Sequence, residues 1–345
     1  MYLDNKRVLI TGGTGSLGKV LVRRILSGQL GSPKSVVVFS RDEAKQHDLR
    51  MDYLNHRAAT DEVMYHNFER TLQFKIGDVR DFHSVAQALT SADIVFNAAA
   101  LKQVPACEYF PFEAVKTNIE GAENIVRAIN ELKLPVESVV AISTDKACKP
   151  TNVMGMTKAI QERIFLAANI SCPQTRFIAV RYGNVLASRG SVVPLFIDQI
   201  AAGGPITLTD KSMTRFLLTL DQAVDTVFEA LQFAAAGETY IPRIKAALIQ
   251  DVAIALVGSQ KVKVVESGIR PGEKMHEIMI SEEESLRTIS RGEYFAIKSI
   301  LPEVATTSSE PFIEFAEVSS ANYLMSTDEV KKFLEKHLSG DLISN

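Results

Sequence analysis

Short apolar runs alternate with longer amphipathic segments along the first half of the chain. Each run is followed by a turn and then by a stretch in which apolar residues recur at helical spacing. The runs predict strands at 7–10, 35–40, 72–76, 93–97, 139–142 and 176–181, and the spacing predicts helices at 19–27, 42–54, from 81, 113–132 and 153–168. Strands that alternate with helices form a parallel sheet with right-handed crossovers. The sequence therefore predicts an α/β fold with a doubly wound parallel sheet.

The pattern changes after Tyr182, where the elements become shorter and more scattered. We predict a loop at 183–192, helices at 194–202 and 220–235, strands at 206–209 and 262–266, a turn at 270–274 leading into a helix, a strand at 312–315 and a helix at 326–338. These strands are too few for an independent sheet. We expect a smaller α/β lobe of residues 183–345 that closes over a first domain of residues 1–182, interleaved with it and without a linker. Residues 56–70 are polar and irregular and predict a loop.

Composition narrows the class of protein. The 345 residues suggest about two domains, and 46% hydrophobic with 23% charged residues is ordinary for a globular chain. A net charge of -3 provides no basic field for nucleic acid or an anionic membrane. Three unpaired cysteines, the absence of a long apolar run and a strand pattern at the very start favour a cytoplasmic protein without a membrane partner. The spacing of the histidines provides no metal site.

A glycine-rich turn joins the first strand to the first helix. Gly12, Gly15 and Gly18 have one residue more in the first gap than the G-x-G-x-x-G fingerprint, but they meet the same need. A turn without side chains lets backbone N–H groups and a helix N-terminus approach a pyrophosphate. We predict dinucleotide binding here. The alternative is a turn that only packs the helix on the sheet.

The end of the second strand bears on the choice of dinucleotide. An acidic residue there binds the ribose 2′-hydroxyl of NAD, whereas an arginine accommodates the 2′-phosphate of NADP. Ser40 and Arg41 favour NADP over NAD, and Asp42 either serves NAD or caps the next helix.

The third and fourth strands also end in candidate ligand residues. Asp78 is placed to meet an adenine amino group or to cap the next helix. The small residues 98–100 let a ligand lie against the backbone, and Lys102 is either a pocket cation or an exposed loop lysine. Asn118, on an apolar helix, needs buried partners and braces the neighbouring strand end or contacts the cofactor.

The central stretch is Ser143-Thr144-Asp145-Lys146, directly after a buried strand. It places a hydroxyl, a carboxylate and an ammonium at the sheet edge where ligands bind in open α/β folds. Lys158 follows one turn into the next helix, on the face that it shares with Met154. An ordinary surface ion pair is the alternative for Asp145 and Lys146.

Basic residues recur in the second half, and converging Arg and Lys side chains bind pyrophosphate well. The candidates are Arg189, Arg215, Arg270 and Lys274. Each one singly also fits a surface charge.

At these residues the chain resembles the extended short-chain dehydrogenase/reductase family, which has a Rossmann-like cofactor domain. Within that family it is similar to the polysaccharide-biosynthesis branch, the UDP-N-acetylglucosamine 4,6-dehydratases, over nearly the whole chain. The stretches that carry the resemblance are 39–43, 98–105, 143–147, 181–185 and 270–274. The resemblance implies a lyase that makes a UDP-4-keto-6-deoxy sugar for surface polysaccharide or glycan biosynthesis, by internal hydride transfer through tightly held NADP.

The resemblance also implies residue roles. Lys146 is the C5 base, which needs a lowered pKa, and Asp145 is the acid for the C6 hydroxyl. Thr144 bonds O4, and Lys158 holds the nicotinamide ribose. The cofactor set is Thr11, Gly12, Gly15, Ser16, Leu17, Gly18, Ser40, Arg41, Asp78, Val79, Ala98, Ala99, Ala100, Lys102, Asn118 and Lys158. The substrate set is Lys102, Met154, Asn184, Val192, Arg215, Arg270 and Glu273.

One departure from the wider family is Met154, which replaces the tyrosine of Tyr-x-x-x-Lys and resembles a subset of the dehydratases that also carry Met here. A thioether has no proton to exchange, so we expect the O4 proton to go to Asp145 or to a water. A UDP-sugar 4-epimerase and a non-catalytic NADP-binding protein remain as rival readings. We also expect a homo-oligomer, a dimer or a hexamer, with a dimer contact through helices at 109–131 and 153–170.

Overall fold

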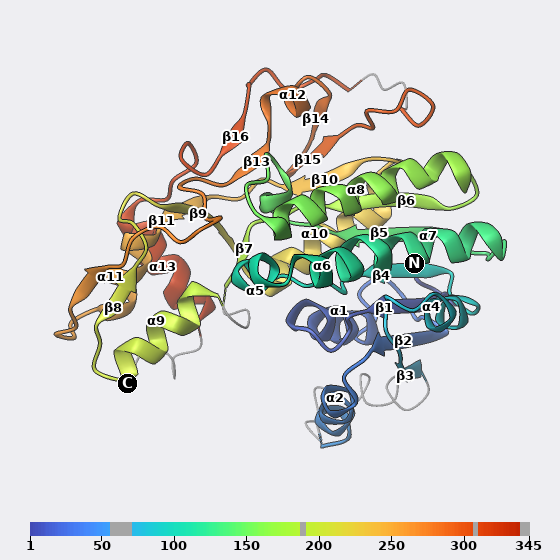
Figure 1. The fold of residues 1–345 in the computed structure, drawn as a ribbon, viewed down its shortest axis with the longest axis horizontal. Coiled ribbons are helices and arrows are strands. Elements are labelled where there is room, and N and C mark those ends of the chain that lie inside the picture. Colours follow the sequence, from blue (N-terminus) through green and yellow to red (C-terminus); the bar gives the residue numbers. More distant parts are fainter. Residues whose placement is uncertain (56–70, 187–190, 306–309, 339–345) are drawn as a thin grey trace.

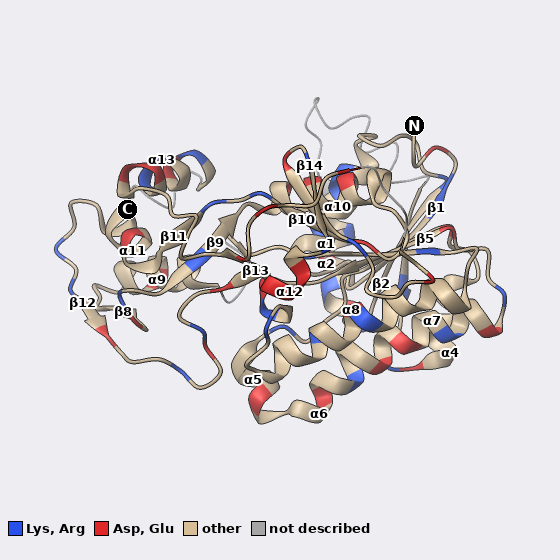
Figure 2. Cartoon of the chain, turned by 90° about the horizontal axis from the view of Figure 1, so that it is seen from above, with Lys and Arg blue, Asp and Glu red and all other residues tan. Residues whose placement is uncertain are grey.

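The computed structural model describes residues 1–55, 71–186, 191–305 and 310–338. The loop predicted at 56–70 and Arg189 lie outside these ranges. Lys and Arg are interspersed with Asp and Glu over the whole ribbon, as Figure 2 shows. Among the described residues no helix is long and apolar enough to cross a membrane.

A nine-stranded sheet runs through the molecule in the order β14-β15-β10-β6-β5-β4-β1-β2-β3 (Figure 1). Seven neighbouring strands, β3 to β10 in this order, are parallel, and β15 and β14 continue the sheet antiparallel. The bounds are β1 (Arg7–Thr11), β2 (Ser35–Ser40), β3 (Leu72–Ile76), β4 (Ile94–Asn97), β5 (Ser138–Ile142), β6 (Arg176–Val180), β10 (Thr239–Pro242), β14 (Thr288–Arg291) and β15 (Tyr294–Ile297). The predicted doubly wound α/β fold is confirmed.

Helices cover both faces of this sheet because its strands are apolar on both sides. Val8 and Ile10 belong to one core cluster with α1 (Ser16–Leu26) and α10 (Leu220–Phe233). Leu9, between them, belongs to a second cluster with α4 (Phe82–Leu89), α7 (Gly121–Glu131) and α8 (Val153–Ser171). This alternation follows the two-residue period of a strand. Another helix, α2 (Glu43–Asn55), follows β2.

The second half of the chain contributes to two places. Its strands β10, β15 and β14 join the main sheet, and other segments form a lobe at the left of Figure 1 with its own apolar core. The lobe contains β7 (Asn184–Val185), α9 (Val192–Ala201), β8 (Ile206–Leu208), β9 (Thr214–Leu218), β11 (Ala246–Leu248), α11 (Ile249–Val257), β12 (Val264–Glu266) and α13 (Thr327–His337). The division at residue 182 stays a prediction, and the chain crosses back into the main sheet after it.

The structure corrects three predicted elements. The helix expected at 113–132 is divided into α6 (Pro111–Ala114), the π-helical η2 (Val115–Glu120) and α7. The turn at 270–274 leads into a strand, β13 (Ile278–Ile280), which pairs with β16 (Val318–Ser319). The strand expected at 312–315 is a single bridge between Phe312 and Ile289. All three outcomes depend on contacts with residues distant in the chain, and local periodicity does not predict such contacts.

The small strands also form more sheet than expected. Residues of the second half build a three-stranded sheet, β11-β9-β7, and the two-stranded sheets β12-β8 and β13-β16. The predicted C-terminal helix is confirmed: Ser326 caps α13 by accepting from the backbone N–H of Glu329.

Candidate active site

The carboxyl ends of the central strands meet at one edge of the sheet and are joined there by hydrogen bonds. Thr11, at the end of β1, donates from Oγ1 to Asn97 Oδ1 of β4 at 2.6 Å. The backbone N–H of Ala99 donates to the same hydroxyl at 3.3 Å. The small residues 98–100 therefore lie directly beside the glycine-rich turn.

The turn requires its glycines. Gly12 has φ +68°, and a Cβ there would lie 2.7 Å from the backbone nitrogen of Ala99. A Cβ on Gly18 would lie 2.5 Å from Gly13 Cα. Gly15 is the N-cap of α1 and provides no side-chain hydrogen bond, so the first-turn N–H groups of Ser16 and Leu17 have no cap. This uncapped helix N-terminus at a sheet edge fits a dinucleotide phosphate.

The end of β2 places Arg41 and Asp42 differently. Arg41 is exposed, with Nη1 3.7 Å from Asp78 Oδ2. Asp42 Oδ1 accepts from the backbone N–H of Lys45 at 3.0 Å and so caps the start of α2. Of the two roles that the sequence left open for Asp42, capping is therefore seen. Ser40 accepts from Gln46 Nε2 at 3.1 Å.

Asp78 does not cap the next helix. Its carboxylate accepts from the backbone N–H of Arg80 at 3.0 Å and from Arg80 Nη2 at 2.6 Å, while Asp81 accepts from His83 N and is the N-cap of α4. Burial would raise the pKa of Asp78, but the Arg80 guanidinium lowers it. The side chain of Val79 packs in the second core cluster.

Asn118 braces the loop after β4. It is fully buried, accepts from the N–H of Leu101 at 2.9 Å and donates to Leu101 O and Thr157 Oγ1, each at 3.0 Å. Its contact with cofactor stays a prediction. Lys102 follows this loop with an exposed side chain, and its partial burial lowers its pKa.

The central stretch forms a buried ion pair. η3 (Asp145–Ala147) begins just after β5, and Asp145 Oδ1 accepts from Lys146 Nζ at 3.0 Å and from Thr144 Oγ1 at 2.9 Å. Asp145 is 0% exposed, which excludes the ordinary surface pair. Burial raises the pKa of Asp145 although Lys146 opposes it.

Lys146 departs from one expectation. A lysine base was expected to have a lowered pKa, and burial does act in that direction. The carboxylates of Asp145 and Glu277 outweigh burial, so the pKa of Lys146 is raised. Glu277 Oε1 lies 3.1 Å from Lys146 Nζ, and Asn184 Oδ1 lies 3.4 Å from the same nitrogen.

Lys158 and Met154 lie on α8 beside this pair. Lys158 Nζ donates to Ile142 O, at the end of β5, and to Gln161 Oε1. Burial lowers the pKa of Lys158 to about 8. Met154 is 5% exposed and packs with Cys107 and Ala114, so its position in the family motif is occupied by an apolar, proton-free side chain.

The basic residues of the second half only partly converge. Arg215 and Lys274 both approach Glu277, with shortest distances of 3.9 and 3.8 Å. Arg270 is exposed and Arg189 lies outside the described residues. Val192 begins α9, and Glu273 has a buried carboxylate oxygen without a hydrogen-bond partner.

Buried polar atoms without hydrogen-bond partners gather at this edge. Six such side-chain atoms occur among the described residues, and four belong to Ser143, Asp145, Gln161 and Glu277. A folded protein rarely leaves such groups unsatisfied without a functional reason. Their concentration here therefore supports a ligand site.

Glu277 is the residue that sequence reasoning missed. It follows a polar turn that predicts solvated side chains, yet it is 2% exposed. Despite burial, the cations Lys146, Arg215 and Lys274 lower its pKa. Glu277 is recognised as a site residue only by its buried carboxylate among three cations. No local pattern in the sequence predicts this arrangement.

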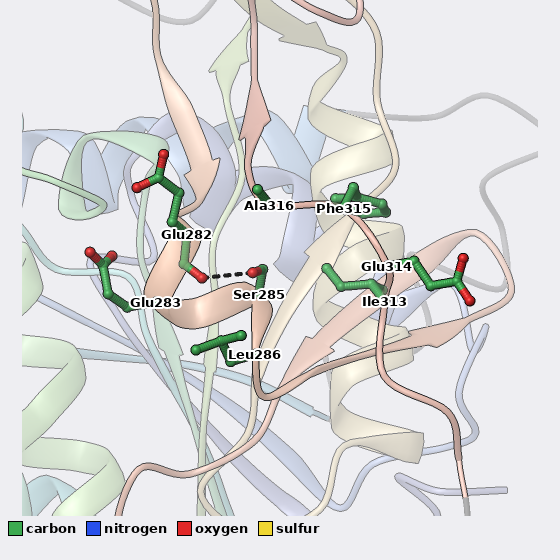
Figure 3. Close-up of a pocket in the computed structure, with 8 residues that line it drawn as sticks. All are labelled: Glu282, Glu283, Ser285, Leu286, Ile313, Glu314, Phe315 and Ala316. Carbon is green, nitrogen blue, oxygen red and sulfur yellow. Dashed lines mark hydrogen bonds between the residues drawn. The ribbon is translucent and has the colours of Figure 1, made fainter.

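A separate hollow lies between α12 (Glu282–Ser285) and residues 313–316, whose lining side chains Figure 3 shows. Glutamates and apolar side chains line it, and none of its lining residues belongs to the Asp145–Lys146–Glu277 cluster. Among the residues with described positions, no group of His, Cys, Asp and Glu could hold a metal ion.

Comparisons with known proteins show the family and the fold. The sequence model of a family described as polysaccharide biosynthesis protein matches residues 8–299. UDP-glucose 4-epimerase of Rickettsia bellii (strain OSU 85-389) is 42% identical over 303 residues, covering 86% of this chain and 84% of that protein. The X-ray structure of Pen from Bacillus thuringiensis superposes with a TM-score of 0.87 at 35% identity, over 97% of this chain and 99% of that one. The dTDP-glucose 4,6-dehydratase DesIV of Streptomyces venezuelae, with NAD and TYD bound, has a TM-score of 0.65 at 20% identity over 78% and 86%, a likeness of fold.

Proposed function

This chain belongs to the polysaccharide biosynthesis protein family, and from that premise we propose that it is an NADP-dependent UDP-N-acetylglucosamine 4,6-dehydratase. Its product is a UDP-4-keto-6-deoxy-N-acetylhexosamine. The reaction removes one water from the sugar and consumes no cofactor overall.

The buried Asp145–Lys146 pair supports this function best. Dehydration needs a base for the C5 proton and an acid for the C6 hydroxyl, whereas epimerisation at C4 needs neither. Asp145 Oδ1 and Lys146 Nζ are 3.0 Å apart and share a hydrogen bond. Burial raises the pKa of Asp145, which favours the protonated form that an acid requires.

The pair provides both groups when its shared proton lies on Asp145. Lys146 is then neutral and takes the C5 proton, and Asp145 protonates the leaving C6 hydroxyl, which departs as water. The ammonium of Lys146 returns its proton to C5 at the end. The proton of O4 leaves to a water when C4 is oxidised, and through that water Asp145 regains the proton that it gave to the C6 hydroxyl.

The glycine-rich turn and the first turn of α1 would hold the dinucleotide phosphates. The bound dinucleotide supplies reversible two-electron redox chemistry at the sugar. Arg41, exposed at the end of β2, favours NADP, because Asp42 is engaged in capping α2. Lys158 would hold the ribose nearby, with a pKa of about 8 that keeps a cationic donor near neutral pH.

Substrate contacts come from both halves of the chain. Thr144 would bond O4, and Met154 cannot accept its proton. Asn184 and Arg215 approach Lys146 and Glu277 from the lobe. Lys102, Val192, Arg270 and Glu273 complete the proposed nucleotide-sugar site.

A UDP-sugar 4-epimerase is the second candidate. The relative from Rickettsia bellii, at 42% identity, is named UDP-glucose 4-epimerase. An epimerase product has the same mass as its substrate, so mass decides between the two activities.

The deciding experiment is mass spectrometry of UDP-N-acetylglucosamine incubated with the protein in heavy water. We expect a product that has lost one water and carries deuterium at C5. An isomer of unchanged mass would replace the proposal by the epimerase, and unchanged substrate would leave a non-catalytic binding protein.

Lys146→Ala tests the role of the base in the same assay. Dehydration should fall about 100-fold or more, with NADP binding retained. Lys149→Ala is the matched control, because Lys149 lies nearby but pairs with Glu317 at 2.6 Å, away from the cluster. Normal turnover by Lys146→Ala would refute the assignment.

A further inference from the structure

Glu277 lies at the centre of a charge cluster contributed by separate segments of the chain. Its Oε1 is 3.1 Å from Lys146 Nζ and 3.9 Å from Arg215 Nε, and its Oε2 is 3.8 Å from Lys274 Nζ. Lys146 belongs to η3, Arg215 to β9 and Lys274 to the turn before β13. The carboxylate therefore links the acid–base pair to the lobe.

The backbone of Glu277 is held independently of these cations. Its N–H donates to Ser320 Oγ at 2.9 Å, and the N–H of Ser320 donates to Glu277 O at 2.8 Å. Ser320 Oγ is in turn 2.6 Å from Thr214 Oγ1. All three residues are buried. These backbone hydrogen bonds fix the position of Glu277, so that its carboxylate is held beside Lys146 as a positioning group requires.

The arrangement is poorly explained by stability alone. A buried carboxylate costs free energy unless its oxygens are satisfied. Glu277 Oε2 is buried without a hydrogen-bond partner, and so is Asp145 Oδ2. Two carboxylates therefore face three cations, and each carboxylate has one oxygen without a hydrogen-bond partner. Such an arrangement is expected of a site in which protons are transferred.

On the basis of the proposed dehydration, we propose that Glu277 is a positioning residue that orients Lys146 Nζ and stabilises the ammonium formed when Lys146 takes the C5 proton. In that step the C5–H bond breaks and a bond from the proton to Nζ forms. The electron pair left on C5 forms the C5–C6 double bond as the C6–O bond breaks. Asp145 supplies the proton with which the hydroxyl leaves as water.

The electrostatics agree with this role. The groups facing Lys146 are Asp145, Glu277 and Arg215, and the groups facing Glu277 include Lys274 as well. Burial lowers the pKa of Lys146, and the two carboxylates together raise it above its usual value. Glu277 also raises the pKa of Asp145, secondary to burial and against the effect of Lys146. One carboxylate thus favours both the ammonium of Lys146 and the acid form of Asp145.

The test is the pH dependence of kcat for dehydration, in which the acidic limb reports the loss of a second proton from the Asp145–Lys146 pair, leaving the one shared proton of the active form. Glu277→Gln removes a negative charge beside the pair, so the pKa for this loss falls and the limb should move to lower pH by about one unit or more. We expect kcat on the plateau to fall about tenfold or more, because Lys146 becomes a weaker base, while KM changes less than about threefold.

Two variants accompany Glu277→Gln. Glu277→Asp keeps the charge on a shorter side chain, and its limb should lie between those of the wild type and Glu277→Gln. Glu266→Gln is the matched control, because Glu266 is exposed on β12 and pairs with Lys211. Its profile should match that of the wild type.

The outcomes separate this inference from the proposed function. Absence of a dehydrated product with the wild type would refute both. A wild-type product combined with an unmoved limb in Glu277→Gln, even with lower kcat or stability, would refute the role of Glu277 alone. Direct titration of the Lys146 Nζ signal by NMR of 15N-lysine protein with NADP supplies the second readout, and an unchanged pKa in Glu277→Gln would overturn the inference.

Discussion

At the residue scale, two buried carboxylates beside the same lysine have pKa values shifted in opposite directions. Burial raises the pKa of Asp145, whereas the three cations around Glu277 overcome burial and lower its pKa. Environments that separate the pKa values of neighbouring groups are how proteins assign acid and base roles. Asp145 is thereby suited to donate a proton and Glu277 to remain an ionised partner of Lys146.

The role of Met154 also follows from its immediate surroundings. It packs with Cys107 and Ala114 and is buried. The side chain therefore fills apolar space and has no proton to exchange. On the proposed function, we expect the O4 proton to pass to Asp145 or to a water.

Arg41→Ala tests the choice of dinucleotide. Loss of one charged contact to a 2′-phosphate should weaken NADP binding about 10- to 100-fold and leave NAD binding unchanged. Calorimetric titration with both dinucleotides measures the difference, and Lys45→Ala, next to the same strand end, is the control. An equal loss for NAD and NADP would show that Arg41 does not contact the 2′-position.

At the scale of secondary-structure elements, two structural features position the site. The π-helical segment η2 interrupts the helix between residues 111 and 131 and carries Asn118, which fastens the loop after β4 to α8. Such segments are common at functional sites. The second feature is Arg181, just after β6, which donates to Glu162 of α8 and Glu284 of α12 at 2.7 and 2.8 Å. It ties α8 to α12 in the C-terminal part of the chain.

Glu284→Gln tests the contribution of the Arg181–Glu284 ion pair to stability. Burial raises the pKa of Glu284, but Arg181 outweighs it and the pKa is lowered to about 2. The folded state therefore gains stability that is fully present above about pH 4.3 and is lost as pH falls towards 2. At neutral pH the variant should lose about 3 kcal/mol of unfolding free energy.

Urea unfolding across this pH range measures the effect. The difference between Glu284→Gln and the wild type should narrow as pH falls below about 4.3. Glu282→Gln, at an exposed position of the same helix, should stay within about 0.5 kcal/mol of the wild type. A difference for Glu284→Gln that is independent of pH would argue against the ion pair.

At the scale of the whole molecule, one side presents exposed apolar residues from neighbouring helices. They come from α5 (Val104–Tyr109), α6 and α8, which lie side by side in Figure 2 and contact one another. Tyr109 and Phe112 are 82% and 61% exposed, and Met156 and Ile160 are 46% and 47% exposed. A cluster of large exposed apolar side chains marks an interaction surface. It coincides with the dimer contact that we predict from the sequence.

Phe112→Asp tests this contact. A charge in the middle of an apolar interface should weaken self-association about tenfold or more, with the fold preserved because the residue is exposed. Sedimentation velocity over a concentration series measures the change. Phe233→Asp on α10, at a residue 60% exposed on the opposite face of the sheet, is the control. A monomeric wild type, or an unchanged dimer in Phe112→Asp, would contradict the prediction.

The first half of the fold was predictable because its strands and helices are specified by patterns of neighbouring residues along the chain. Apolar runs and helical spacing placed the strands and helices around Thr11, Asp78 and Asp145 close to where they lie. Beyond residue 182 the strands are short, and their pairing depends on distant partners. β13 was therefore mistaken for a helix start, and the strands that extend the main sheet were missed.

The sequence by itself determined the doubly wound sheet, the glycine-rich turn and the position of Asp145 and Lys146 at a strand end, because these follow from periodicity and from neighbours along the chain. Only the tertiary structure decided that Glu277 meets both Lys146 and Arg215, that Arg181 joins α8 to α12, and that Lys146 has a raised rather than a lowered pKa. These depend on burial and on charges brought together from distant segments, and a pKa is set by that surrounding charge and not by the adjacent sequence.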